Sequence, residues 1–321
     1  MTLPLVLERD AIARRLSQVD VMSPIKDGFV RFSRGEADIP APGELRFDDP
    51  PGDAHLKYGR LRGGRHYVVK IASGFPENLR RFGVSTSQGM ILLFDARTGE
   101  PRAVLFDDGL LTRTRTAVAG AVCAEALGPP DIEAIGVLGS GAQARIQLEY
   151  LRDVTSCRRV HIWSQDQARA AQLCEHAAAM GYRATPERTP ADVARVARLI
   201  VTTTRATKPL LMRDDVAPGT HITAVGSDTP DKVELDPALV ARADVIVADS
   251  IPQCRIRGEI AWALRAGTID PSRIVELGAI LAHEAAGRRS PTDITIADLT
   301  GVAIQDLMIA EAVFDAGSSE A

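Results

Sequence analysis

The 321-residue chain has few cysteines, and they are not paired in the sequence. Cys123, Cys157, Cys174 and Cys254 lie far apart, without a Cys-x-x-Cys motif and without histidines at zinc-ligand spacing. Neither a disulfide framework nor a metal site is therefore indicated. Nothing near these cysteines would activate a thiol as a nucleophile, so we interpret them as reduced and mostly packed.

Long apolar runs and a surplus of basic residues are also missing. No stretch approaches the roughly 18 uncharged apolar residues of a membrane span, and residues 1–10 contain no signal-type apolar core. Lysine and arginine number 38 against 42 acidic residues, a net charge of −4. Broad nucleic-acid binding needs a basic face. We therefore expect a cytoplasmic protein that binds neither membranes nor nucleic acids.

The local sequence pattern changes near residue 130. Before it, turn-rich stretches separate strand-like runs at 67–71, 90–94 and 103–106. After it, short apolar runs alternate with helical periodicity, which predicts a parallel sheet with helices on both faces. The tail at 302–314 is apolar at helical spacing and could return to the first half.

A glycine-rich turn follows the expected strand at 132–138 and opens a helix at Ala142. In Gly139-Ser140-Gly141-Ala142-Gln143-Ala144, the first glycine permits a tight turn and the second lets the backbone approach a pyrophosphate. The helix N-terminus then offers N–H groups to the phosphates. This motif predicts dinucleotide binding, and a purely structural glycine turn is the alternative.

The tip of the following strand should read the adenosine ribose of the dinucleotide. It holds Ser164, with Asp166 two residues later and no arginine before Arg169. An acid at this tip favours a free 2′-hydroxyl, whereas an arginine favours a 2′-phosphate. NAD(H) is therefore favoured and NADP(H) stays open. The alternative role for Asp166 is to cap the next helix.

Several residues could bind an anionic substrate. Lys70 ends an apolar strand before a turn-rich stretch, where its ammonium could hold a carboxylate. Asp228 lies at the carboxyl end of another expected strand, the edge at which doubly wound sheets bind ligands. The ordinary readings are a solvated lysine and a turn aspartate. The cations near expected strand ends are Arg46, His55, Lys57, Lys70, Arg113 and Arg115.

Six segments together resemble the ornithine cyclodeaminase/mu-crystallin family over nearly the whole chain. They are Lys70–Asn78, Thr98–Pro101, Thr112–Ala117, Gly139–Ala144, Val225–Leu235 and Asp298–Asp306. The resemblance implies an α/β protein with a Rossmann doubly wound parallel sheet at 118–301. A smaller α+β domain for substrate binding and dimerisation would comprise residues 1–117 and 302–321. It also implies a homodimer.

The resemblance also implies roles for individual residues. Asp228 would be the acid/base for the proton on the substrate nitrogen, and Lys70 would bind the substrate carboxylate together with Arg46 or Arg115. Thr300 is assigned to the substrate as well. The residues that would line the cofactor, beyond Gly139, Ser140, Gly141, Ser164 and Asp166, are Thr86, Arg115, Ala142, Gln143, Thr202, Val225, Gly226, Ser227, Asp228 and Lys232.

The sequence departs from the family pattern at 52–57, where ornithine cyclodeaminases place a glutamate near His55. His55 and Lys57 stand here instead. A cation facing the distal ammonium of a diamine at contact distance is unfavourable by about 1 to 4 kcal/mol.

We therefore expect an NAD(P)H-dependent oxidoreductase that reduces a small imino acid and runs backwards as an amino-acid dehydrogenase. Its substrate would be an iminosuccinate-like dicarboxylate or a cyclic ketimine. The alternatives are an ornithine-type cyclodeaminase with bound NAD and a non-catalytic ligand-binding protein.

Overall fold

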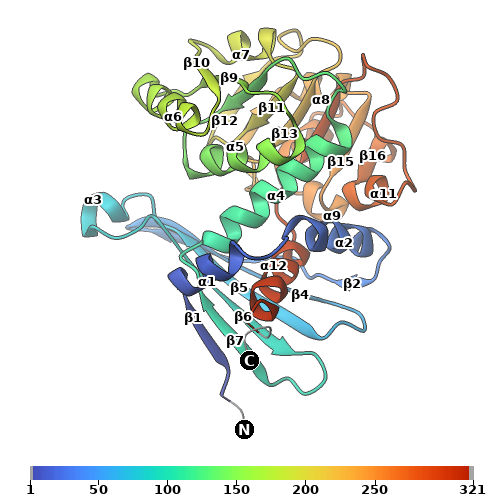
Figure 1. Cartoon of the computed structure of the whole chain (residues 1–321). Helices are drawn as coiled ribbons and strands as arrows, with labels where there is room; N and C mark the ends of the chain where they lie inside the picture. Colours follow the sequence, from blue (N-terminus) through green and yellow to red (C-terminus); the bar gives the residue numbers. More distant parts are fainter. Residues whose placement is uncertain (1–2, 318–321) are drawn as a thin grey trace. The chain divides into compact units, whose positions relative to one another are not determined.

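The structure is a computed structural model that describes residues 3–317 (Figure 1). The chain divides into two compact units, and the division falls between Arg115 and Thr116, within helix α4 (Leu110–Leu127). The first unit contains the described residues up to Arg115 together with those from Val302 on. The second unit is Thr116–Gly301.

The first unit is built on a seven-stranded sheet with the order β1-β7-β6-β5-β4-β2, and β3 pairs with β4. Its neighbouring strands are antiparallel, except for the parallel pair β1 and β7. The strands are β1 (Leu5–Glu8), β2 (Ala37–Asp38), β3 (Gly43–Asp48), β4 (Pro51–Leu61), β5 (His66–Gly74), β6 (Ser87–Asp95) and β7 (Pro101–Phe106). The helices are α1 (Arg9–Leu16), α2 (Met22–Ser33), α3 (Asn78–Phe82) and α12 (Ala303–Asp315).

The two faces of this sheet differ, because successive side chains of a strand point to opposite sides. On the covered face, Val68, Lys70, Ile91 and Leu105 are buried, and helix α12 packs against β4, β5 and β6. The other face carries a cross-strand row of Tyr58, Val69, Leu92, Val104 and Val6. We call these five residues the open row, since Val6 and Tyr58 are 56% and 42% exposed.

The second unit holds an eight-stranded, entirely parallel sheet with the order β10-β9-β8-β11-β13-β17-β15-β16. The strands are β8 (Ile135–Leu138), β9 (Arg159–Trp163), β10 (Arg183–Pro186), β11 (Leu199–Thr202), β13 (His221–Ala224), β15 (Val245–Ala248), β16 (Ile274–Glu276) and β17 (Thr295–Asp298). A separate pair is β12 (Thr207–Leu211) and β14 (Val233–Leu235). The helices after α4 are α5 (Ala142–Val154), α6 (Gln167–Ala179), α7 (Pro190–Val196), α8 (Pro237–Arg242), α9 (Ile251–Cys254), α10 (Gly258–Arg265) and α11 (Leu277–Leu281).

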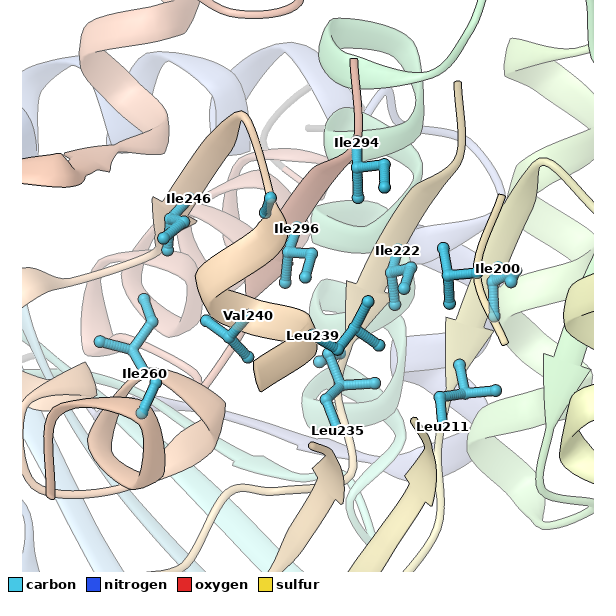
Figure 2. Close-up of a cluster of buried hydrophobic side chains, with 14 of the residues drawn as sticks. Ile200, Leu211, Ile222, Leu235, Leu239, Val240, Ile246, Ile260, Ile294 and Ile296 are labelled. Carbon is cyan, nitrogen blue, oxygen red and sulfur yellow. The ribbon is translucent and has the colours of Figure 1, made fainter. Parts of the chain in front are cut away.

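The core of the second unit explains why this sheet forms. Ile200, Ile222, Ile246 and Ile296 come from adjacent strands and pack against apolar residues of α8 and α10 (Figure 2). Parallel strands buried on both faces read as continuous apolar runs, which is what the sequence has after residue 130. The expected fold class, with its Rossmann doubly wound sheet, is confirmed.

Candidate functional site

The glycine-rich turn lies at the point where the strand order of the second unit reverses. The chain runs outward from β8 to β9 and β10, and then returns to β11 on the other side of β8. Gly139 follows β8 with φ of 118°, and a Cβ built on it would lie 2.5 Å from Thr203 Oγ1. Ligands of doubly wound sheets bind in the crevice at this reversal. The turns after β8 and β11 are therefore in contact where a dinucleotide is expected.

The start of helix α5 fits a phosphate group. Its N-cap is Gly141, so no capping side chain occupies the first-turn N–H groups, whereas Asp166 and Thr189 cap α6 and α7. A Cβ on Gly141 would meet nothing within 4 Å, which leaves open space above the turn. Gln143 Nε2 is buried and has no hydrogen-bond acceptor in the described chain. An anionic oxygen would satisfy both sets of donors.

Asp166 acts as a helix cap in this structure. Its Oδ1 accepts hydrogen bonds from the backbone N–H of Ala168 and Arg169, at 3.0 and 3.2 Å. At the tip of β9, Ser140 Oγ donates to Ser164 Oγ at 2.8 Å. The capping role that the sequence left open for Asp166 is therefore present, and its contact with the ribose stays a prediction. The prediction that Ser164 faces the ribose stays a prediction.

Two turns at the carboxyl edge of the sheet carry the remaining cofactor candidates of the second unit. Thr202 ends β11, and the turn Val225–Asp228 follows the adjacent strand β13. Asp228 has an exposed carboxylate, 54% accessible, which lies 2.6 Å from Lys232 Nζ. The structure therefore brings Val225, Gly226, Ser227, Asp228 and Lys232 together in one turn.

In the first unit, two buried cations meet on one carboxylate. Lys70 Nζ lies 2.9 Å from both carboxylate oxygens of Asp306, and Arg115 Nε donates to Asp306 Oδ1 at 3.0 Å. Burial lowers the pKa of Lys70 to about 8, although Asp306 opposes this shift. Burial opposes ionisation of Asp306 too, but Lys70 and Arg115 outweigh it and hold the pKa of Asp306 below its usual value.

The sequence pattern at Lys70 and Arg115 did not lead to Asp306 or to its neighbour Gln305. Gln305 Oε1 accepts from Arg115 at 3.0 Å, while its Nε2 is buried without an acceptor in the described chain. An acid and an amide inside the apolar tail helix α12 are the signal that could have found them, since such groups are rarely buried without a partner.

His55 and Lys57, from the segment 52–57, lie on the same sheet face as Lys70. The register pairs Lys57 with Lys70 directly across β4 and β5, and it pairs His55 with Glu44 and Arg46 with Asp53 across β3 and β4. His55 lies 3.7 Å from Glu44 and 3.6 Å from Asp53. Two carboxylates therefore lie beside His55, in addition to the cations Lys57 and Arg46 on the same face.

Two further candidates differ in their surroundings. Thr86 lies just before β6, and its carbonyl accepts from Phe75 N–H at 2.9 Å. Thr300 is buried, its hydroxyl donates to Asp249 at 3.0 Å, and it accepts from Gln253 at 2.8 Å. A substrate hydrogen bond from Thr300 would have to replace its bond to Asp249.

Residues 3–317 contain neither a candidate metal centre nor a helix that could span a membrane. No group of three or more His, Cys, Asp or Glu side chains there could hold a metal ion. None of the helices in this range has both the length and the apolar character needed to cross a bilayer.

Comparison with known proteins identifies the family. The model of the ornithine cyclodeaminase/mu-crystallin family matches residues 3–321. An uncharacterized cyclodeaminase of Sinorhizobium fredii is 38% identical over 300 residues, 92% of this chain and 90% of that protein.

Solved structures agree with this match along the whole chain. An archaeal alanine dehydrogenase dimer with bound NAD superposes with a TM-score of 0.90 at 30% identity, covering 99% of this chain and 97% of that one. The iminosuccinate reductase of Paracoccus denitrificans in complex with NAD+ gives the same TM-score, identity and coverage. The chain belongs to the ornithine cyclodeaminase/mu-crystallin family.

Proposed function

We propose that the protein is an NAD(H)-dependent reductase of a small imino acid that also oxidises the corresponding amino acid. The observation that carries the proposal is the cluster of Lys70 and Arg115 on Asp306. Two cations on one carboxylate leave one positive charge in a buried place. That charge complements a single substrate carboxylate. Gln305 Nε2, which lacks an acceptor in the described chain, would donate to the same group.

The second unit supports the choice of cofactor. Bound NADH supplies the hydride, and this chain supplies binding, position and charge. The turn at Gly139–Gly141, the uncapped start of α5 and Gln143 would hold the pyrophosphate. Relatives with 30% identity were solved with NAD or NAD+ bound. NADP(H) remains an alternative cofactor, since neither an acid nor an arginine stands at Ser164.

Asp228 is proposed either to donate a proton to the imine nitrogen or, as a carboxylate, to accept a hydrogen bond from the protonated nitrogen. Its carboxylate is half exposed at the carboxyl edge of the sheet, so a substrate can reach it. Lys232 Nζ, 2.6 Å away, would hold the side chain in place. Protonation of the nitrogen builds positive character beside a carboxylate, which stabilises it.

The side chain of the substrate would meet the face that holds Arg46, His55 and Lys57. Lys57, directly across from Lys70, favours a second carboxylate such as that of iminosuccinate. Glu44 and Asp53 beside His55 reduce the positive charge of this face. A neutral cyclic ketimine is therefore the competing substrate.

A cyclodeaminase is the second candidate, and Glu44 is the observation that favours it. Its Oε1 lies 3.7 Å from His55, and the carboxylate could pair with the distal ammonium of a diamine. Release of ammonia from ornithine without net turnover of NAD would identify this activity.

The open row supports a homodimer. Five apolar side chains from five adjacent strands form one continuous row, two of them about half exposed. Such a row favours burial against a second surface. The alanine dehydrogenase relative is itself a dimer.

The test is a screen of NADH and NADPH oxidation with oxaloacetate, pyruvate, glyoxylate and cyclic ketimines, the oxo acids each with ammonia. Activity that falls at least about a hundredfold in Lys70→Ala would support the proposal. Activity with oxaloacetate plus ammonia that also falls in Lys57→Ala would identify a dicarboxylate substrate. Tight NADH binding without turnover of any compound would contradict the proposal and favour a binding protein.

A further inference from the structure

A fully buried glutamate joins the two turns that carry the cofactor candidates of the second unit. Glu234 lies on β14 and has no exposed surface. Its Oε2 accepts from Thr202 Oγ1 at 2.6 Å and from Gly226 N–H at 2.9 Å, and its Oε1 accepts from Thr204 N–H at 2.6 Å. One carboxylate thus connects the turn after β11 to the turn after β13.

The backbone of Glu234 is itself held by a second buried carboxylate. Glu259, in the first turn of α10, accepts from the backbone N–H of Glu234 and of Leu235, each at 2.9 Å. The turn is fixed at its other end as well, since Ser227 Oγ and Trp262 Nε1 both donate to the carbonyl of Lys232. The segment from Gly226 to Leu235 is therefore held at three places.

Burial of these carboxylates calls for an explanation beyond simple packing. Within residues 3–317, neither Glu234 nor Glu259 forms an ion pair with a basic side chain. Burial raises the pKa of Glu234, and burial together with Glu234 raises the pKa of Glu259 to about 8. Placing such groups in a core is unfavourable unless hydrogen bonds compensate for the lost solvation, and here those bonds connect the two turns.

A carboxylate suits this position because all of its oxygen sites are acceptors. The three groups that face Glu234 are donors, and each finds an oxygen. A glutamine would turn its NH₂ group toward a backbone N–H and lose at least one bond. The two turns pack so closely at Gly226 that no side chain fits there, since a Cβ on Gly226 would lie 2.2 Å from the carbonyl oxygen of Thr204.

We propose that Glu234 is a positioning residue that sets the Thr202–Thr204 turn against the Gly226–Asp228 turn before the dinucleotide binds. The inference rests on the proposed function, because it takes these turns as the cofactor-facing edge and Asp228 as the proton donor. Glu234 acts through them and touches neither substrate nor cofactor. A preformed arrangement of this kind lowers the ordering cost of binding and fixes the proton donor.

The test compares Glu234→Gln with Asp244→Asn. Asp244 Oδ2 accepts from Ile294 N–H at 2.8 Å near the opposite, amino-terminal edge of the same sheet. It is thus a carboxylate–backbone contact without a place in the proposed site, although Asp244 is exposed whereas Glu234 is buried. NADH affinity is measured by fluorescence titration, stability by thermal unfolding, and kcat and KM with the imine that wild type reduces.

We expect Glu234→Gln to raise the Kd for NADH at least about tenfold and to lower kcat, while Asp244→Asn leaves both unchanged. Equal NADH affinity and kcat in the two variants would overturn the inference. Wild type that fails to bind NADH would overturn the proposed function as well, whatever the variants do.

A second measurement needs no variant, in case Glu234→Gln does not fold. Hydrogen exchange of the Thr204 and Gly226 amides is followed in wild type with and without NADH. Both amides donate to Glu234, so we expect them to be protected before NADH is added. Fast exchange of both without NADH would show that the arrangement is not preformed and would contradict the inference.

Discussion

Lys70 and Arg115 both donate to Oδ1 of Asp306, so the charge of the whole cluster depends on this acid. We expect Asp306→Asn to raise the KM for the imino acid by about tenfold or more. Without the carboxylate, burial lowers the pKa of Lys70 further below 8 and the ammonium loses its proton near neutral pH. The Kd for NADH should stay unchanged, which separates this effect from unfolding. An unchanged KM would contradict the role of Asp306.

The pKa of Lys70 also predicts how the wild type responds to pH. Above about 8 the buried ammonium loses its proton, so KM for the imino acid should rise as pH increases from 8 to 10. The same proton loss has the opposite effect on stability, because it increases the free energy of unfolding while substrate binding weakens. Between about 8 and 10.5 the unfolded chain holds the lysine proton that the folded chain has lost, so this group makes folding more favourable as pH rises. A KM that stays flat up to pH 10, with the protein folded, would exclude Lys70 from carboxylate binding.

Cofactor preference depends on the tip of β9. Ser164→Asp places a carboxylate at the ribose position, where it would accept from a 2′-hydroxyl and repel a 2′-phosphate. We expect the kcat/KM ratio of NADH to NADPH to rise about tenfold or more, whereas Ser164→Ala, which removes only the hydroxyl, should change both cofactors alike. Equal losses with both cofactors in Ser164→Asp would mean that the side chain does not face the ribose.

At the scale of the elements, Asp166 is expected to stabilise helix α6 as its N-cap. Replacing this N-cap by alanine removes two hydrogen bonds to the first turn and should lower the free energy of unfolding by about 1 kcal/mol. Asp166→Asn keeps the cap and should be close to wild type in stability. Denaturant unfolding measures both, and the Kd for NADH should be the same in all three proteins. A higher Kd for NADH in the two variants than in wild type would indicate that Asp166 contacts the ribose.

Elements with strong local signals were predicted well from the sequence. The strand Val245–Ala248 and the start of α5 at Ala142 agree with the structure, because an apolar run and a glycine turn mark them locally. Strand β8 begins at Ile135 rather than at 132, and α4 begins at Leu110 rather than at 116. Capping and pairing decide such ends, and the periodicity does not report on them.

Other elements depend on contacts that the sequence pattern does not carry. Strand β3 is exposed at all six residues, and its short alternation of Leu45 and Phe47 with polar residues lies between two turn-rich stretches. Strand β17 pairs between β13 and β15, far from both in the order of the chain. Asp306 reaches Lys70 across 236 residues. Local patterns could suggest Lys70 as a site residue, but its partner Asp306 becomes apparent only when helix α12 is seen packed against the sheet.

At the scale of the whole molecule, the open row should decide the oligomeric state. Leu92 lies at the centre of the row, between Val69 and Val104. Leu92→Glu would bury a charge in the proposed interface, which is unfavourable by several kcal/mol, about enough to dissociate a dimer at micromolar concentration. We expect light scattering to give a dimer for wild type and a monomer for Leu92→Glu.

The control for this change is Thr98→Glu, which adds the same charge in the exposed turn between β6 and β7. It should remain a dimer. Both variants should bind NADH like wild type, because the turn Gly139–Gly141 and the start of α5, which are proposed to hold the pyrophosphate, belong to the second unit, whose sheet does not include Leu92. A wild type that is monomeric would contradict the proposed homodimer, and a dimeric Leu92→Glu would mean that another surface forms the interface.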